Sequence, residues 1–130
     1  KSDLMCATWD VMPTLCDMTG IPSPQNIDGI TFLPTLMQSG EQQKHPFLYW
    51  EFPGYNGQQA VRLGKWKGIR FNMQKGNLKM KLFDLENDIR EQHDVADEHP
   101  EIVKKMEDIM KKEHTTAAVD RFKMKVIDGD

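Results

Sequence analysis

The segment from residue 58 to residue 71 constrains the fold of this chain more than any other. Two runs, QQAVRL and WKGIRF, flank Gly64-Lys65, and both contain the β-branched and aromatic residues that favour strands. A glycine at the first position of a two-residue loop fits a type II′ turn, which reverses the chain into a hairpin. Pairing outward from this turn sets Leu63 opposite Trp66 and Arg62 opposite Lys67. The sequence therefore predicts an antiparallel sheet around this hairpin.

Two further strands and a long helix complete the predicted fold. The aromatic run at residues 47–52 and the run KMKLFDL at residues 79–85 both favour strands. A helix is predicted at residues 100–114, where Pro100 suits the first turn and two lysines favour the C-terminal end. Its apolar residues form one stripe: Ile102, Val103, Met106, Ile109 and Met110. The predicted fold class is α+β, a small four-stranded antiparallel sheet covered by a C-terminal helix.

The remaining segments predict a separate N-terminal part and a short tail. A helix is expected at residues 10–19, with Asp10 as its N-cap and Gly20 as its C-cap. One or two helical turns follow at residues 32–37, and the apolar period becomes strand-like from residue 45. We therefore divide the chain into a connecting helix and loop, residues 1–44, and a subdomain, residues 45–130. Alternating apolar residues in the tail suggest an edge strand: Phe122, Met124 and Val126.

Charge and hydropathy exclude two classes of partner. The chain of 130 residues carries a net charge of −3, so it lacks the basic surface of a nucleic-acid-binding protein. No apolar run approaches the roughly 18–20 residues of a membrane helix. The chain opens on Lys1-Ser2-Asp3 without an initiator methionine or a leader, which fits a processed protein or an excised fragment, and we expect the second.

Residues that bind metals elsewhere lack a metal-site pattern here. Cys6 and Cys16 have no ligand spacing, and either two free thiols or a disulfide fits the sequence. The acidic run at residues 84–88 fails the EF-hand pattern, because Ile89 and Val95 stand where a glycine and a glutamate are required. Surface or helix-capping roles are the expectation for the four histidines: His45, His93, His99 and His114.

The region around the loop at residues 52–59 is the candidate binding site. It combines flat aromatic faces with hydrogen-bonding groups, as sugar rings require. The candidate residues are Trp50, Glu51, Tyr55, Asn56, Gln59 and Arg62. The alternative is a core tryptophan beside a merely exposed loop. Because Arg62 and Lys67 are directly opposed like charges, a neighbouring carboxylate is expected, either Glu51 or Asp84.

Five segments, in order, resemble the C-terminal end of arylsulfatases of the alkaline-phosphatase superfamily. They are ATWDVMPTLCDMTGIP, NIDGITFLPTLMQSG, FLYWEF, QAVRLGKWKGIR and KLFDLENDIREQHDVADEHPEIVKKM. The resemblance implies a C-terminal subdomain packed against a large catalytic domain, with strand ends near the rim of the substrate pocket. The helix at residues 10–19 would pack on that catalytic domain.

The resemblance also implies chemistry that this chain does not carry. Such enzymes use a formylglycine, made in a Cys/Ser-x-Pro-Ser/Ala-x-Arg motif, and a calcium ion. Neither Cys6 nor Cys16 begins that motif. The expected function is therefore a sulfatase fragment that completes the fold and shapes the pocket for a sulfated carbohydrate or an aryl sulfate. A stand-alone glycan- or protein-binding module is the alternative. The parent enzyme would be an exported one, and the isolated chain is a candidate homodimer.

Overall fold

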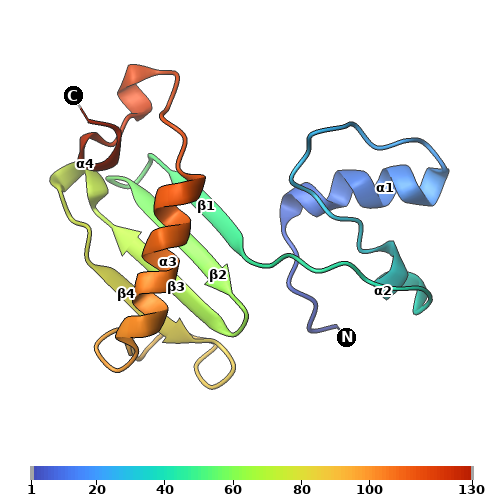
Figure 1. Ribbon diagram of the computed structural model, residues 1–130, viewed down its shortest axis with the longest axis horizontal. Helices are drawn as coiled ribbons and strands as arrows, with labels where there is room; N and C mark the ends of the chain where they lie inside the picture. The colour runs from blue at the N-terminus through green and yellow to red at the C-terminus, as the bar shows by residue number, and fades with distance from the viewer. Residues whose placement is uncertain (1, 130) are drawn as a thin grey trace. The chain divides into compact units, whose positions relative to one another are not determined.

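Four antiparallel strands form a meander in which each strand pairs with the next in sequence (Figure 1). They are β1 (Leu48–Phe52), β2 (Gln58–Leu63), β3 (Trp66–Phe71) and β4 (Met80–Asp84). The computed structural model describes residues 2–129 and contains two compact units, residues 1–48 and 49–130. The predicted α+β class and the predicted four-stranded sheet are confirmed.

The β2–β3 hairpin has the predicted turn and register. Gly64 has a φ of 56°, whereas Lys65 is not among the residues with positive φ, as a type II′ turn requires. Leu63 pairs with Trp66 and Arg62 pairs with Lys67. Local turn chemistry thus sets which side chains of β2 and β3 share a face.

The prediction that Glu51 or Asp84 neutralises the Arg62–Lys67 pair is wrong. The Lys67 ammonium lies 2.5 Å from Glu91, in the segment after β4. Arg62 Nε donates to the carbonyl of Gly64 at 2.9 Å, and Asp84 binds Lys65 instead at 2.7 Å. Successive residues of a strand point to opposite faces, so Lys67 meets the loop that crosses one face of the sheet while Glu51 belongs to the other.

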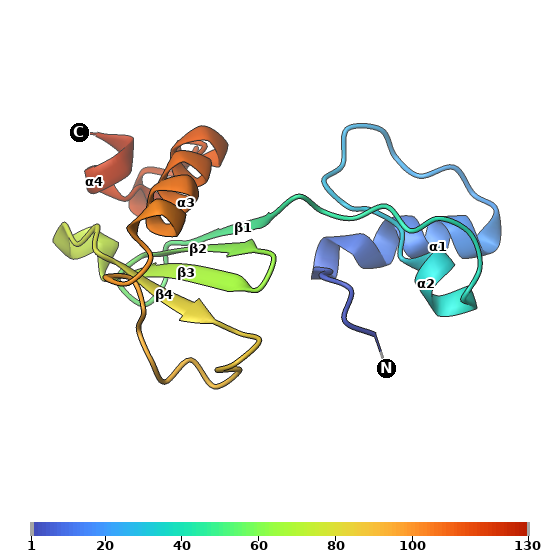
Figure 2. The ribbon, with the colours of Figure 1, turned by 60° about the horizontal axis from the view of Figure 1, so that its bottom comes forward.

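The helix α3 (Pro100–Glu113) lies across one face of the sheet (Figures 1 and 2). Its predicted apolar stripe is confirmed, because Met106 is 0% exposed and Met110 is 1% exposed. The helix sits close because β3 carries a glycine beneath it: a Cβ at Gly68 would lie 2.5 Å from Met106 Sδ. Val61 and Leu82 pair with Gly68 and are buried on this face, and a further cluster of buried residues, Ile69, Phe83 and Leu85, belongs to the other face of the sheet.

The first unit contains η1 (Thr8–Asp10), α1 (Val11–Thr19) and α2 (Leu33–Met37). Gly20 ends α1 in the left-handed conformation, as predicted. The Asp10 side chain does not cap α1; it accepts hydrogen bonds from the amides of Ala7 and Ile30 and lies 2.8 Å from His45 Nε2. Burial disfavours the charge, but these donors outweigh it and lower the pKa of Asp10 below its usual value.

The tail is helical, so the predicted edge strand is wrong. It contains η3 (Asp120–Phe122) and α4 (Lys125–Asp128). Asp128 Oδ2 accepts the amide hydrogen of Met124 at 2.6 Å, which closes a helical turn that an extended tail could not make. Met124 is only 3% exposed, and its sulfur packs against Gly57.

Two further properties follow from the described residues. No helix within residues 2–129 has the length and hydropathy needed to cross a membrane.

Cys6 and Cys16 are both free thiols, and Cys6 is exposed. The first of the two alternatives that the sequence left open for the cysteines is therefore the one observed.

The contact between α3 and the sheet predicts a large cost for truncating its central methionine. We expect Met106→Ala to lower the free energy of unfolding by about 2–5 kcal/mol, because it leaves a cavity above Gly68. Lys105→Ala, at an exposed position of the same helix, serves as the control and should change it by less than about 0.5 kcal/mol. Urea denaturation followed by circular dichroism measures both, and equal effects would contradict the packing described here.

Candidate functional site

A buried polar network occupies one end of the sheet face that α3 covers. Its members, which we call the polar network, are Tyr49, Glu51, Gln59, Arg70 and His114. Tyr49 and Glu51 are two residues apart on β1 and so share a face, while Gln59 and Arg70 are register partners on β2 and β3. His114 follows the last residue of α3. Gln59 is 2% exposed and Arg70 is 8% exposed, so these polar groups require partners inside the protein.

The donors of the polar network converge on Glu51. Gln59 Nε2 donates to the Tyr49 hydroxyl at 2.9 Å and to Glu51 Oε1 at 2.7 Å. The Tyr49 hydroxyl donates to the same carboxylate oxygen, and His114 Nδ1 lies 2.8 Å from it. One oxygen that receives several hydrogen bonds must be an acceptor without a proton of its own. Glu51 Oε1 is therefore the shared acceptor of the polar network.

The Tyr49 phenol keeps its proton in this setting. Burial raises the pKa of Tyr49, and the adjacent Glu51 charge raises it further. Both effects oppose formation of a second anion beside the first. Tyr49 is thus a permanent donor to Glu51, and it is not a candidate acid or base.

Arg70 connects the polar network to a cavity beside α3. Its Nη1 donates to Gln59 Oε1 at 3.3 Å, and its Nη2 donates to Glu107 at 2.8 Å. The cavity has a volume of about 430 Å³ and is lined by both signs of charge. Its lining comprises Gln59, Arg70, Leu78, Glu107, Asp108, Met110, Lys111, His114 and Ile127. Arg70 Nε has no hydrogen-bond partner among residues 2–129, but it is closed off from solvent.

The loop between β1 and β2 presents Tyr55 and Asn56 on a braced backbone. The amide of Gln74, in η2 (Met73–Lys75), donates to the carbonyl of Asn56 at 2.9 Å, and that of Met73 donates to Gly57 at 3.2 Å. Tyr55 and Asn56 both have positive φ, 50° and 64°, which is a costly conformation for a bulky residue such as tyrosine. The Tyr55 side chain is 81% exposed, so the strain orients an aromatic ring toward solvent.

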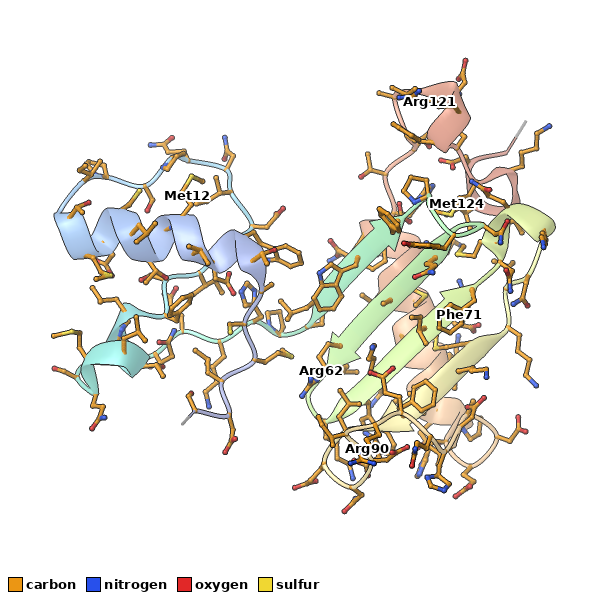
Figure 3. All side chains as sticks on the ribbon, turned by 180° about the vertical axis from the view of Figure 1, so that it is seen from behind. Met12, Arg62, Phe71, Arg90, Arg121 and Met124 are labelled. Carbon is orange, nitrogen blue, oxygen red and sulfur yellow. The ribbon has the colours of Figure 1, made fainter. Side chains whose placement is uncertain are left out.

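The six predicted site residues fall into three places. Glu51 and Gln59 meet inside the polar network, and Tyr55 and Asn56 meet on the loop. Trp50 lies on β1 with 37% of its surface exposed. Figure 3 shows Arg62 at the hairpin end of the sheet, opposite the end where Met124 packs on the loop. The structure therefore does not bring Arg62 to the loop.

The surface-or-capping expectation is wrong for His45, whereas His114 is the C-cap residue of α3 but keeps its side chain largely buried. The side chains of His45 and His114 are only 10% and 16% exposed, and each contacts a carboxylate. His93 is 79% exposed on its side chain, and His99 precedes α3 with its ring 4.6 Å from that of Trp66. The sequence also did not single out Tyr49, Arg70 and Asp128. For Tyr49 a signal existed, because it lies two residues before Glu51 on a predicted strand.

The acidic turn after β4 uses its carboxylates for structure. Asp84 binds Lys65, and this hydrogen bond lowers the pKa of Asp84 to about 2. Asp88 accepts the amide hydrogens of Gln92 and His93, and the latter bond leads in lowering its pKa. Within the described range, residues 2–129, no group of three His, Cys, Asp or Glu side chains could hold a metal ion.

Several known proteins similar to this chain are sulfatases. The sequence profile of the family described as N-sulphoglucosamine sulphohydrolase, C-terminal, matches residues 1–116. Arylsulfatase K of Rattus norvegicus is 34% identical over 103 residues, covering 72% of this chain and 18% of that protein. Delta 4,5-hexuronate-2-O-sulfatase of Bacteroides thetaiotaomicron is 40% identical over 45 residues, covering 35% of this chain and 9% of that protein.

The fold agrees with the same group of proteins. The solved structure of a 2-O GAG sulfatase superposes with a TM-score of 0.68 at 25% identity, covering 79% of this chain and 23% of that chain. The chain spans about a fifth of the length of the curated arylsulfatases that it matches.

The polar network predicts unequal roles for the two tyrosines of the chain. Tyr49→Phe removes a hydroxyl that both accepts and donates, so we expect the free energy of unfolding to fall by about 1–2 kcal/mol. Tyr55→Phe is a matched control, since this ring is exposed, and its effect should stay within about 0.5 kcal/mol. Guanidinium unfolding of the two variants checks this. A silent Tyr49→Phe variant would show that Glu51 does not need the phenol.

Proposed function

We propose that this chain completes the fold of a sulfatase and shapes its substrate pocket. The premise is that the chain belongs to the family described as N-sulphoglucosamine sulphohydrolase, C-terminal. In this proposal the first unit, residues 1–48, attaches the chain to the catalytic domain. The second unit contributes the loop between β1 and β2 to the rim of the pocket.

The observation that carries the proposal is the exposed apolar surface of the first unit. Seven large apolar side chains of α1, α2 and the turn after α1 are 46–66% exposed. They are Val11, Met12, Leu15, Met18, Ile21, Leu36 and Met37. Clustered apolar side chains of this size mark a surface that is covered in the assembled protein. The relatives are about five times longer than the region matched, so their remaining sequence is the natural occupant.

The proposed substrate is a sulfated carbohydrate. Two of the similar proteins carry names that refer to sulfated sugars, a 2-O GAG sulfatase and a hexuronate-2-O-sulfatase. The Tyr55 ring and the Asn56 amide offer the combination that sugars bind: an apolar face for the ring carbons and polar groups for hydroxyls. The aryl group of an aryl sulfate would meet fewer of these groups.

The chemistry of sulfate ester hydrolysis is assigned to the rest of the protein. A formylglycine and a calcium ion are general features of the family. The residues present here do not fit either group, because neither cysteine lies in the modification motif and no acidic cluster in residues 2–129 suits a metal. In this proposal the chain binds and positions, and the steps on sulfur occur elsewhere.

The docking role predicts that a charge on α1 harms the assembled enzyme but not the isolated chain. In the intact sulfatase we expect Leu15→Lys to reduce the yield of soluble active enzyme at least about tenfold, because a buried unpaired charge costs several kcal/mol. In the isolated chain the same change should alter stability by less than about 0.5 kcal/mol.

Ser39→Lys adds the same charge at an exposed position of the same unit and serves as the control. Yield on expression and thermal unfolding of the isolated chain are the measurements. A wild-type chain that sediments as a dimer and becomes a monomer on Leu15→Lys would instead assign this face to a second copy.

The rim role predicts a substrate-dependent defect. In the intact enzyme, Tyr55→Ala and Asn56→Gly should each lower kcat/KM for a sulfated oligosaccharide about tenfold, which corresponds to ~1.4 kcal/mol of lost transition-state binding. Their kcat/KM for a small aryl sulfate should be unchanged, because that substrate does not reach the loop.

Arg62→Ala, at the opposite end of β2, is the matched comparison. Normal kinetics on the oligosaccharide would limit the contact to the loop, whereas a defect equal to that of Tyr55→Ala would extend it along the strand. Equal losses on both substrates in the loop variants would contradict a role in sugar recognition.

A further inference from the structure

The side chain of His114 lies between two carboxylates from distant parts of the chain. Its Nδ1 is 2.8 Å from Glu51 Oε1, and its Nε2 is 3.2 Å from Asp128 Oδ1. The side chains of His114 and Asp128 are 16% and 2% exposed. His114 therefore joins β1 to α4, and the tail of residues 115–129 is held at this junction.

The positions of the hydrogens follow from the acceptors. Glu51 already accepts from Tyr49 and Gln59, so His114 Nδ1 must donate to it. Nε2 and Asp128 Oδ1 lie 3.2 Å apart, are both closed off from solvent and have no hydrogen-bond partner among the described residues. A second imidazole proton would put a positive charge beside the Asp128 carboxylate. With a neutral ring, two unpaired acceptor atoms face each other at this distance, which is unfavourable.

We propose that the doubly protonated His114 holds the C-terminal tail against the sheet, and that loss of its second proton releases the tail. We call the ion pair between protonated His114 Nε2 and Asp128 the latch. The other ring nitrogen, Nδ1, donates a hydrogen bond to Glu51 in both protonation states. Because the latch needs the proton on Nε2, the position of the tail depends on pH.

The groups around His114 act in both directions. Glu51 from β1 and Asp128 from α4 favour its positive charge by direct contact. Arg70 from β3 and Lys111 from α3 line the same cavity and oppose that charge, while Glu107 and Asp108 from α3 support it. Tyr49 remains neutral. Arg70 is already paired with Glu107, so the two carboxylates in contact with the ring dominate.

Release of the tail would also remove a packing contact from the loop between β1 and β2. Apart from the latch, Met124 is the buried anchor of the tail, and its sulfur would lie 2.7 Å from a Cβ at Gly57. The helix α4 also contacts η2, whose amides hold the loop backbone. Figure 1 shows α4 beside this end of the sheet. A tail that leaves the sheet therefore removes Met124 from beneath Gly57.

The direction of the pH effect follows from the form that binds. Only the doubly protonated ring carries the charge that pairs with Asp128, so acid favours the docked tail and alkali favours its release. Histidines ordinarily change charge between about pH 5 and pH 8, so the tail is compared at about pH 5.5 and about pH 7.5.

Hydrogen exchange of the chain at these two pH values, corrected for intrinsic exchange rates, tests the latch. We expect protection of the amides in α4 and at Gly57 to fall about tenfold from pH 5.5 to pH 7.5. Amides in the middle of α3 report on the global fold and should not change. Equal protection of α4 at both pH values in the wild-type chain would overturn the proposal.

Two variants shift the latch in opposite directions. His114→Gln has no proton to gain, so α4 should exchange rapidly at both pH values. Asp128→Asn can donate to a neutral Nε2, so α4 should stay protected at both. His93→Gln, at an exposed histidine, is the control and should retain the wild-type pH dependence. A pH dependence that persists in His114→Gln, or disappears in His93→Gln, would exclude His114 as the sensor.

Discussion

The charge of Glu51 is the constraint on which the second unit depends. A largely buried carboxylate is stable only when donors surround it, and here they come from β1, from β2 and from the residue after α3. Each donor is itself fixed by a further contact, as Gln59 is by Arg70. The sheet and its covering helix are thus joined at one end by a shared acceptor, Glu51 Oε1, and elsewhere by Met106, which lies over Gly68.

The two units differ in where their buried carboxylates and their apolar side chains lie. In the first, one buried carboxylate, Asp10, joins the start of α1 to a following loop and to His45, while the outer surface of α1 stays apolar. In the second, many apolar residues are buried, and three of the exposed aromatic residues, Trp50, Phe52 and Tyr55, lie on β1 and its loop. The first unit therefore has the character of an attachment surface, and the second that of a folded support for a loop.

Features that depend on near neighbours were predictable from the sequence. Gly64-Lys65 determines the hairpin register, and the period of apolar residues determines the buried side of α3. The polar network was not predictable, because Glu51 and His114 are 63 residues apart and many histidines and carboxylates could have paired. The edge strand predicted for the tail was wrong for a related reason. An alternating pattern of only three apolar residues does not outweigh a helical turn that is closed by a hydrogen bond to Asp128. Of the candidate site, the sequence predicted the loop, which stays a prediction, but did not identify the partners that occupy Glu51 and Gln59.

The order of the strands has a consequence for how the protein is made. In a meander every strand pairs with the one that left the ribosome just before it, through short loops, so the sheet can assemble during synthesis without waiting for distant sequence. Helix α3 can cover the sheet next. Asp128 emerges after α3, and until it arrives one nitrogen of His114 has no carboxylate beside it. Synthesis of the segment after α3 is therefore the event that closes this end of the structure.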